Sequence, residues 1–294
     1  MKYHHSLNSS IISILIHSFL ILLGFLCLAP LIHIVAVSLS ASWAAEAGVV
    51  TFWPVGFTTQ SYGFVLSRPQ FIRSFWITIQ RILLGVSINM FLTVLAAYPL
   101  SKNNNVFRFR TVYAWIFIFT ILFSGGLIPL FVTISRLGLI DSMWALVLPG
   151  AVPVFNIIIL LNFFRNLPPE LEEAAFVDGA SHWQILFMIF IPLSKAALAT
   201  LFLFSFVGHW NSWFDGLIYM NTSENYPLAS YLQTVIIGRD LARMTTDEIQ
   251  MVAMVSSRTI RAAQIFLGVL PVLLLYPFLQ RHFQKGIVLG SVKG

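Results

Sequence analysis

Residues Leu167–Pro192 have the sequence LPPELEEAAFVDGASHWQILFMIFIP and form the longest polar interruption in the middle of a very apolar chain. Pro168 and Pro169 end whatever element precedes them, and proline is tolerated in the first turn of a helix because its missing N–H costs nothing there. Three carboxylates follow at once, where they meet the positive end of a helix dipole: Glu170, Glu172 and Glu173. The pattern predicts a short helix that begins at these prolines.

The second half of this stretch predicts a turn and another helix. Gly179 is free to take a positive φ and ends the first helix. Ser181 with Gln184 is typical of a capping box, so a second helix begins there and runs to Pro192. A helix as short as the first cannot stand alone in water. By pattern alone two interpretations stay open: an ordinary connector between membrane helices, or a docking helix that needs a partner to receive it.

The composition predicts a membrane protein. Charged residues make up 10% of the chain and hydrophobic residues 58%, with a mean hydropathy of +0.85. Soluble domains carry about 25% charged residues, and a soluble core cannot absorb this much apolar sequence. The net charge of +6 indicates basic cytoplasmic loops rather than a nucleic-acid partner. A single cysteine, Cys27, excludes an internal disulfide and a metal cluster built on cysteines.

Six apolar runs predict an all-α protein that spans the lipid bilayer six times, within a single domain over residues 1–294. The runs cover residues 11–39, 73–100, 112–134, 142–164, 196–220 and 259–280. Helix breakers interrupt the third and fourth runs: Gly125, Gly126 and Pro129, then Pro149, Gly150 and Pro153. A membrane helix tolerates a break where neighbours or water satisfy the freed carbonyls. Whether the fourth break is a simple kink or part of a substrate pathway stays open.

The distribution of basic residues predicts the orientation. Six spans put both termini on one side of the membrane, together with the polar segment 165–192. All five lysines fall on that side, and four arginines join them: Arg108, Arg110, Arg165 and Arg281. The opposite side has few basic residues outside one long loop, residues 221–258, and long loops weigh less in the positive-inside rule. The termini and the 165–192 segment are therefore expected to be cytoplasmic, and the 221–258 loop external.

Common catalytic motifs are absent from the sequence. There is no GxxxxGK phosphate loop, so the chain is not expected to hydrolyse ATP itself, and HExxH, CxxC and GxSxG are missing as well. No metal site is predicted. The acidic residues lie in loops or at helix ends and form no proton relay, which argues mildly against an ion-coupled secondary carrier for a polar solute. That carrier, and an integral membrane enzyme, are the alternatives to a transport subunit driven by a partner.

The central stretch resembles the EAA motif of ABC-importer permeases. That motif has the form E-A-A, three residues, G, nine residues, I-x-L-P, and the chain matches it from Glu173 through Gly179 to Pro192, with Ile191 in place of the usual Leu. Other segments are similar to the carbohydrate-specific, maltose-type branch: residues 96–102, 166–172, 178–181, 210–213 and 290–294. The resemblance implies a type I ABC importer permease of a bacterial inner membrane, with six transmembrane helices and a cytoplasmic coupling helix.

The resemblance also implies several partners. They are a second permease subunit in a heterodimer, a cytoplasmic ATPase dimer that holds ATP and Mg, and an extracytoplasmic solute-binding protein. Five residues are carried over as the coupling site: Glu173, Ala174, Ala175, Asp178 and Gly179. Glu173 is expected to be the polar anchor, the two alanines to allow close approach of the ATPase, and Gly179 to allow the turn. Asp178 either steadies this hinge or serves local structure alone.

The substrate implied by the resemblance is an oligosaccharide. Flat rings stack on sugar faces and amides bond sugar hydroxyls, so the residues expected in a pathway are Asn156, Trp210, Asn211, Trp213 and Asp215. We interpret either tryptophan alone as a membrane-interface anchor and only the cluster as a pathway element.

Basic residues favour an acidic substrate. The sequence resembles importers of alginate-type oligosaccharides, and four arginines in or near the external loop would suit them: Arg239, Arg243, Arg258 and Arg261. A further basic residue, Arg81, is placed well inside the second apolar run. It either snorkels to the outer interface or takes part in a pathway.

Overall fold

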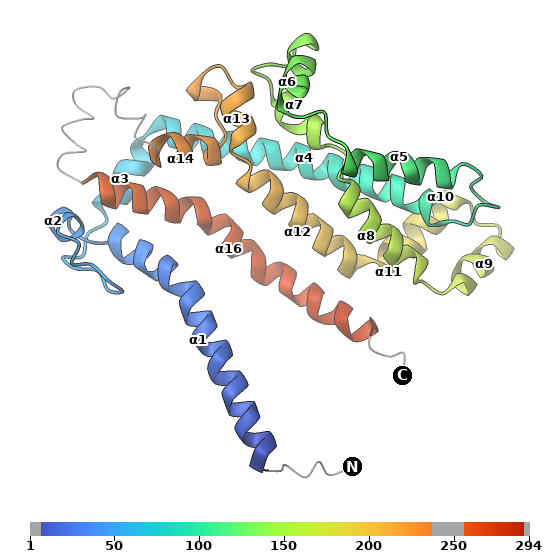
Figure 1. Cartoon of the computed structure of the whole chain (residues 1–294), viewed down its shortest axis with the longest axis horizontal. Helices are drawn as coiled ribbons and strands as arrows, with labels where there is room; N and C mark the ends of the chain where they lie inside the picture. The colour runs from blue at the N-terminus through green and yellow to red at the C-terminus, as the bar shows by residue number, and fades with distance from the viewer. Residues whose placement is uncertain (1–6, 237–255, 291–294) are drawn as a thin grey trace. The chain divides into compact units, whose positions relative to one another are not determined.

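The structure of the protein is a computed structural model that describes residues 7–236 and 256–290. Every regular element in these two ranges is a helix (Figure 1). The helices of the first half are α1 (Leu7–Ser38), α2 (Ser42–Glu46), α3 (Gln60–Ser67), α4 (Pro69–Ser101), α5 (Arg110–Leu122), α6 (Leu127–Arg136), α7 (Met143–Val147) and the 3-10 turn η1 (Leu148–Gly150). The all-α prediction is confirmed.

The second half of the chain is built from shorter helices and one long one. They are α8 (Val154–Arg165), α9 (Pro169–Val177), α10 (His182–Ile185), the π-helical turn η2 (Leu186–Phe190), α11 (Ile191–Leu193), α12 (Lys195–Asn211), α13 (Phe214–Tyr219), the 3-10 turn η3 (Ser223–Asn225), α14 (Leu228–Ile236) and α16 (Ser257–Gly290). Arg239 and Arg243 lie outside the described residues.

The chain divides into two compact units. Unit 1 holds Met1–Pro69 with Thr234–Leu270, and unit 2 holds Gln70–Gln233 with Pro271–Gly294. The single domain expected over residues 1–294 stays a prediction. Both candidate sites described below lie within unit 2.

Small residues form the core of unit 1. Ala36 of α1, Ala44 and Ala45 of α2 and Ala262 of α16 are at most 7% exposed and pack together. Arg258 at the start of α16 is tied into this unit, because its Nη1 donates to the Ala45 carbonyl (3.0 Å). That contact gives Arg258 a local structural role.

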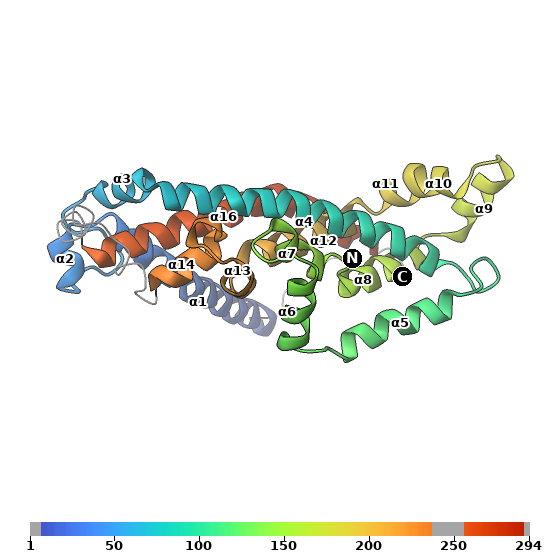
Figure 2. The same ribbon diagram turned by 90° about the horizontal axis from the view of Figure 1, so that it is seen from above.

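The larger core belongs to unit 2 and holds the predicted docking segment. It joins the last turns of α4, the inner face of α8, the α10–η2 segment and the first half of α12, with Leu160, Ile185 and Leu201 fully buried. Figures 1 and 2 both place α9 and α10 beside the end of α4. The short helices of residues 169–193 are therefore held on a rigid base of longer ones.

Helices cover each of the predicted apolar runs, although several are bent or broken. Three segments are long and apolar enough to cross a membrane alone: Ile12–Ser38, Pro69–Ser101 and Ser257–Leu275. In three further cases two successive helices are long and apolar enough only when taken together. The two helices are bent relative to each other by 112° (α5 with α6), 45° (α7–η1 with α8) and 82° (α10–α11 with α12). By length and composition, the described chain thus has three helices that could cross a membrane, or up to six if each bent pair counts as one.

The two predicted breaks lie where the sequence indicated. α5 ends at Leu122, and Gly126, at φ +82°, precedes α6. In the fourth run Pro149 and Gly150 form the turn η1, and Pro153 stands directly before α8. Glycine supplies the left-handed turn without steric cost, and proline is tolerated at a helix start.

The structure corrects the fifth predicted span, 196–220. α12 ends at Asn211, Ser212 is extended, and α13 is a separate helix. Gly216 of α13 approaches α14 so closely that an added Cβ would overlap Ser230. The Ser230 hydroxyl donates to the Trp213 carbonyl in the break (2.7 Å).

The expected external loop 221–258 also begins as folded structure. Leu228 and Tyr231 of α14 are each 2% exposed, and the Leu228 N–H donates to the Thr78 hydroxyl of α4 (2.7 Å). The first part of this segment is therefore packed against unit 2 rather than being a free loop.

Candidate functional site

Helix α9 begins, and the next helix is capped, as the sequence predicts. Pro169 is the first residue of α9, with Glu170 and Glu172 in its first turn. The Ser181 hydroxyl accepts from the Gln184 N–H (3.4 Å), and the Gln184 side chain accepts from the Ser181 N–H (2.8 Å). The predicted capping box is confirmed.

The turn between the two helices depends on Gly179, which takes φ +81°. Its N–H donates to the Phe176 carbonyl (3.0 Å), and the Ala180 N–H donates to the Ala175 carbonyl (2.9 Å). These two bonds are the Schellman arrangement, which requires a left-handed residue. The predicted turn at Gly179 is confirmed, and any other residue there would be strained although no neighbour lies within 4 Å of an added Cβ.

One face of α9 is fastened to the end of α4. Lys102 Nζ lies 2.6 Å from Glu172 Oε1, and the Lys102 side chain is 6% exposed. The ammonium also lies over the rings of Tyr98 (4.0 Å to the centroid) and Phe190 (4.2 Å). Burial lowers the pKa of Lys102, and the hydrogen bond and charge of Glu172 oppose that shift. The ion pair and the two rings together offset the cost of burying the ammonium.

The other face of α9 is open. Ala174, Val177 and Asp178 are exposed, with Val177 at 87%. Glu173 is exposed as well, but it also lines the pocket between α9 and the ends of α4 and α8. Ala175, in contrast, packs against the core of unit 2. The two alanines of the motif thus differ: Ala174 lies on the open face, and Ala175 seats α9 on its own chain.

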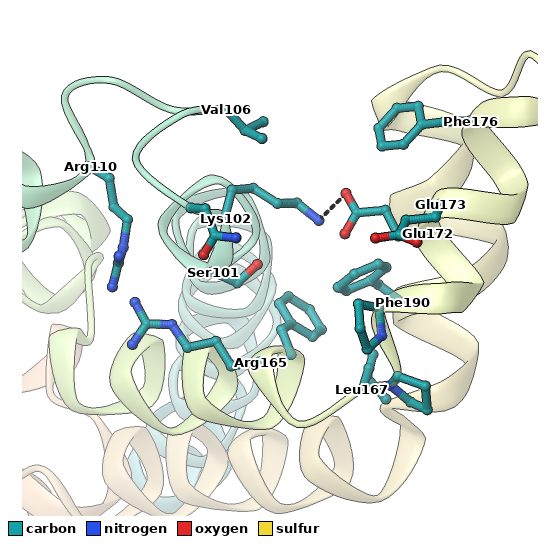
Figure 3. A pocket seen from close by; sticks show the side chains of 14 residues that line it. Ser101, Lys102, Val106, Arg110, Arg165, Leu167, Glu172, Glu173, Phe176 and Phe190 are labelled. Atoms are coloured by element: carbon teal, nitrogen blue, oxygen red, sulfur yellow. Dashed lines mark hydrogen bonds and ion pairs between the residues drawn. The ribbon is translucent and has the colours of Figure 1, made fainter.

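A pocket of about 670 Å³ lies between α9 and the ends of α4 and α8. Figure 3 shows Lys102 reaching across it to Glu172, while Arg110 and Arg165 approach each other on the opposite wall. The two arginines share one acceptor, because Arg110 Nε and Arg165 Nη2 each lie 3.1 Å from the Leu100 carbonyl.

A second polar centre lies midway along α4. Arg81 is 2% exposed, and both terminal nitrogens of its guanidinium pair with the carboxylate of Asp215. It also donates to the carbonyls of Ser212 (3.2 Å) and Leu146 (3.3 Å) and to His209 Nδ1 (3.4 Å). The snorkelling alternative for Arg81 is wrong, since the side chain satisfies carbonyls freed where α12 and α7 end.

Asn89 satisfies the carbonyls that are freed at the break before α8. Its Nδ2 donates to the carbonyls of Gly150 (2.7 Å) and Ala151 (3.0 Å), and its Oδ1 lies 2.9 Å from His209 Nε2. Gly85 lies between Arg81 and Asn89 on the same face of α4, and a Cβ there would overlap the His209 ring. Spacing by four residues puts all three on one stripe of the helix.

This stripe borders a cavity of about 400 Å³ within unit 2. Its polar lining comes from α4, α8, α12, the α12–α13 break and α13: Arg81, Asn89, Asn156, Ser205, His209, Ser212, Asp215 and Tyr219. The Asn156 amide donates to the Ser205 hydroxyl (3.2 Å). A partly enclosed cavity with convergent amides, hydroxyls and aromatic surface has the chemistry of a site for a polyhydroxylated ligand.

The five residues expected in a pathway separate in the structure. Asn156 and Asp215 line the cavity together. Trp210 is buried between Phe206 and Phe75, at centroid distances of 5.9 Å to each. Asn211 and Trp213 are exposed and do not border this cavity.

Sequence reasoning did not assign Lys102 to the site around α9. It also did not assign Asn89 and Gly85 to the polar centre around Arg81 and His209. The spacing of Arg81, Gly85 and Asn89 was the available signal, because two polar residues and a glycine at four-residue intervals mark one face of an apolar helix. For metals, no group of three or more His, Cys, Asp or Glu in residues 7–236 and 256–290 is arranged to hold an ion.

Comparison with known proteins gives consistent relatives. Residues 89–289 match the family described as "Binding-protein-dependent transport system inner membrane component". The polygalacturonan/rhamnogalacturonan transport system permease protein of Bacillus subtilis (strain 168) is 36% identical, over 98% of this chain and 100% of that protein. Protein LplC of the same organism is 41% identical, over 92% of this chain and 91% of its own.

Among solved structures, a bacterial ABC transporter involved in the import of the acidic polysaccharide alginate is similar with a TM-score of 0.87. That chain is 33% identical, with 95% of this chain and 99% of that one covered. A second alginate transporter chain, at 16% identity and a TM-score of 0.55, shares the fold.

Proposed function

Since this chain belongs to the family of binding-protein-dependent transport system inner membrane components, we propose that it is the permease subunit of an ATP-driven importer for acidic oligosaccharides. The proposed complex contains a second permease subunit, a cytoplasmic ATPase dimer that holds ATP and Mg, and an external solute-binding protein. Both termini and α9 face the cytoplasm in this proposal. The solute passes from the binding protein through unit 2.

The two-sided arrangement of α9 carries the coupling part of this proposal. Its inner face is tied to α4 through Lys102 and Glu172, while Ala174 and Val177 on its outer face are exposed. Glu173, which also lines the pocket beside α4, is exposed too. An isolated nine-residue helix would not persist in water, so an open apolar and acidic face on such a helix supports a protein partner. A cleft in the ATPase with a basic group would complement it.

Substitutions at Glu173 and Gly179 are expected to uncouple the complex. In Glu173→Lys the introduced ammonium would face a basic group of the ATPase. In Gly179→Asp the left-handed turn would be strained by about 1 kcal/mol, because Asp is among the side chains that tolerate this conformation best. We expect each variant to be inserted normally but to lose most ATP-dependent uptake, measured with ATPase activity and co-purification of the ATPase. Glu46→Lys, an exposed reversal in unit 1, is the matched control. Normal uptake in both variants at normal abundance would contradict the docking role.

The chemistry of the relatives supports the substrate class. One relative is named for polygalacturonan/rhamnogalacturonan and one solved structure for the import of the acidic polysaccharide alginate. The cavity of this chain offers amide and hydroxyl groups around Asn156 and Ser205, which suit sugar hydroxyls. Its arginine is already paired with Asp215, so the cavity supports sugar recognition, and the selection of acidic solutes is assigned to the binding protein.

Substrate class is testable with one oligosaccharide in two charge states. We expect a uronate oligosaccharide to stimulate the ATPase of the reconstituted complex with its binding protein at least about tenfold more than its methyl ester, since hydrogen bonds to a charged group are worth roughly 1.5–3 kcal/mol. Equal stimulation by both forms would exclude an acidic-substrate preference. Uptake insensitive to vanadate and sensitive to an ionophore would instead favour the ion-coupled carrier.

A further inference from the structure

The pocket behind α9 contains two arginines whose charge is not used within the described chain. Lys102 is paired with Glu172, but Arg110 and Arg165 form no ion pair in residues 7–236 and 256–290. Within the described residues each donates one hydrogen bond, and both bonds go to the Leu100 carbonyl. A guanidinium has five N–H donors, so most of the donors on this wall are free to bind another group.

The two guanidinium groups face each other. Figure 3 shows them approaching from α5 and from α8 on the wall of the pocket opposite α9. Two like charges that converge on one carbonyl repel each other, and the carbonyl carries only a partial negative charge. An oxyanion placed between them would relieve that repulsion and accept bidentate hydrogen bonds from planar, rigidly forked donors.

The surroundings of Arg110 favour an amphiphile over a small ion. Arg110 is the first residue of α5, and no residue of α5 is buried. The apolar side chains that follow it are open, with Val112 56%, Trp115 65% and Ile116 52% exposed. The arginine wall therefore continues directly into an uncovered apolar helix surface.

We propose that Arg110 and Arg165 bind the phosphate of an anionic phospholipid whose acyl chains lie along α5. Three spans end at this level, namely α4 at Ser101, α5 at Arg110 and α8 at Arg165, which is the depth expected of a headgroup. Basic pockets between membrane helices on the cytoplasmic side are suited to such headgroups. The proposal rests on the proposed function only in taking these helix ends to lie at a membrane boundary.

The test is native mass spectrometry of the full chain in mild detergent, titrated with phosphatidylglycerol and, separately, with phosphatidylcholine. We expect Arg110→Gln with Arg165→Gln to lower phosphatidylglycerol retention at least about tenfold, because two charge-assisted contacts are lost. Retention of phosphatidylcholine should fall much less, because its choline cation already offsets the charge of the phosphate. Arg108→Gln with Arg136→Gln removes the same net charge from two exposed positions and should retain phosphatidylglycerol as the wild type does.

Further arms make each outcome decisive. Arg110→Lys with Arg165→Lys keeps the charges and the fold but loses the fork geometry, so an intermediate loss is expected. Equal retention in the glutamine pair and the wild type would overturn the proposal, as would an equal loss in the control pair. Displacement of the lipid by millimolar inorganic phosphate would reassign the site to a free oxyanion. None of these measurements needs ATPase or solute, so the result is independent of the coupling test with Glu173→Lys.

Discussion

Replacement of Arg81 by methionine is expected to prevent stable folding of unit 2. The variant would leave the Asp215 carboxylate without its partner and would free the carbonyls of Ser212 and Leu146, which Arg81 satisfies in the helix breaks. Removal of one member of a buried ion pair costs about 3–5 kcal/mol. We expect severely reduced protein in the membrane and a lower midpoint of thermal unfolding in detergent.

Arg73→Met is the matched control for this variant. Arg73 lies two turns earlier on the same helix and pairs with Glu224 at 2.9 Å, but the two side chains are 53% and 66% exposed. An exposed pair contributes about 0–1 kcal/mol, so this variant should resemble the wild type. Arg81→Lys is expected to rescue only weakly, because an ammonium cannot reproduce the fork that reaches Asp215 and two carbonyls. Equal unfolding midpoints for Arg81→Met and Arg73→Met would refute the role of Arg81 as a cross-link.

Replacement of Lys102 by methionine is expected to separate ATP hydrolysis from uptake. The variant leaves Glu172 unpaired and removes the cation from between Tyr98 and Phe190, while the exposed face of α9 is unchanged. The ATPase should therefore still bind, but movement of α9 would no longer be transmitted to α4. Removing one member of a buried ion pair costs about 3 kcal/mol. We therefore expect the ratio of solute taken up to ATP hydrolysed to fall at least tenfold.

Two further variants distinguish transmission from simple destabilisation. The exchange of Lys102→Glu with Glu172→Lys restores the ion pair but puts a carboxylate against two aromatic faces, so partial recovery of the ratio is expected. Arg108→Met removes an exposed cation from the same loop and should leave the ratio intact. An unchanged ratio in Lys102→Met, with ATPase bound, would show that α9 does not act through α4.

Local rules in the sequence were sufficient to predict the elements around residues 167–192. Paired prolines, a glycine and a Ser–Gln capping box act through bonds between residues at most five apart, and the structure has the helix start, the left-handed turn and the cap at these positions. The same holds for the breaks at Gly126 and at Pro149–Pro153. The end of α12 at Asn211 was missed because it depends on partners far away in the sequence.

The sequence by itself determined that this protein is an all-helical membrane chain with a short polar helix in the middle, because composition, periodicity and turn chemistry are local properties. Only the tertiary structure decided how its polar groups are used. Arg81, Asn89 and Lys102 each pair with groups between 61 and 134 positions away in the sequence, since in an apolar environment every freed carbonyl and every charge must find a partner in space. Which partner that is cannot be read from residues that are neighbours in the chain.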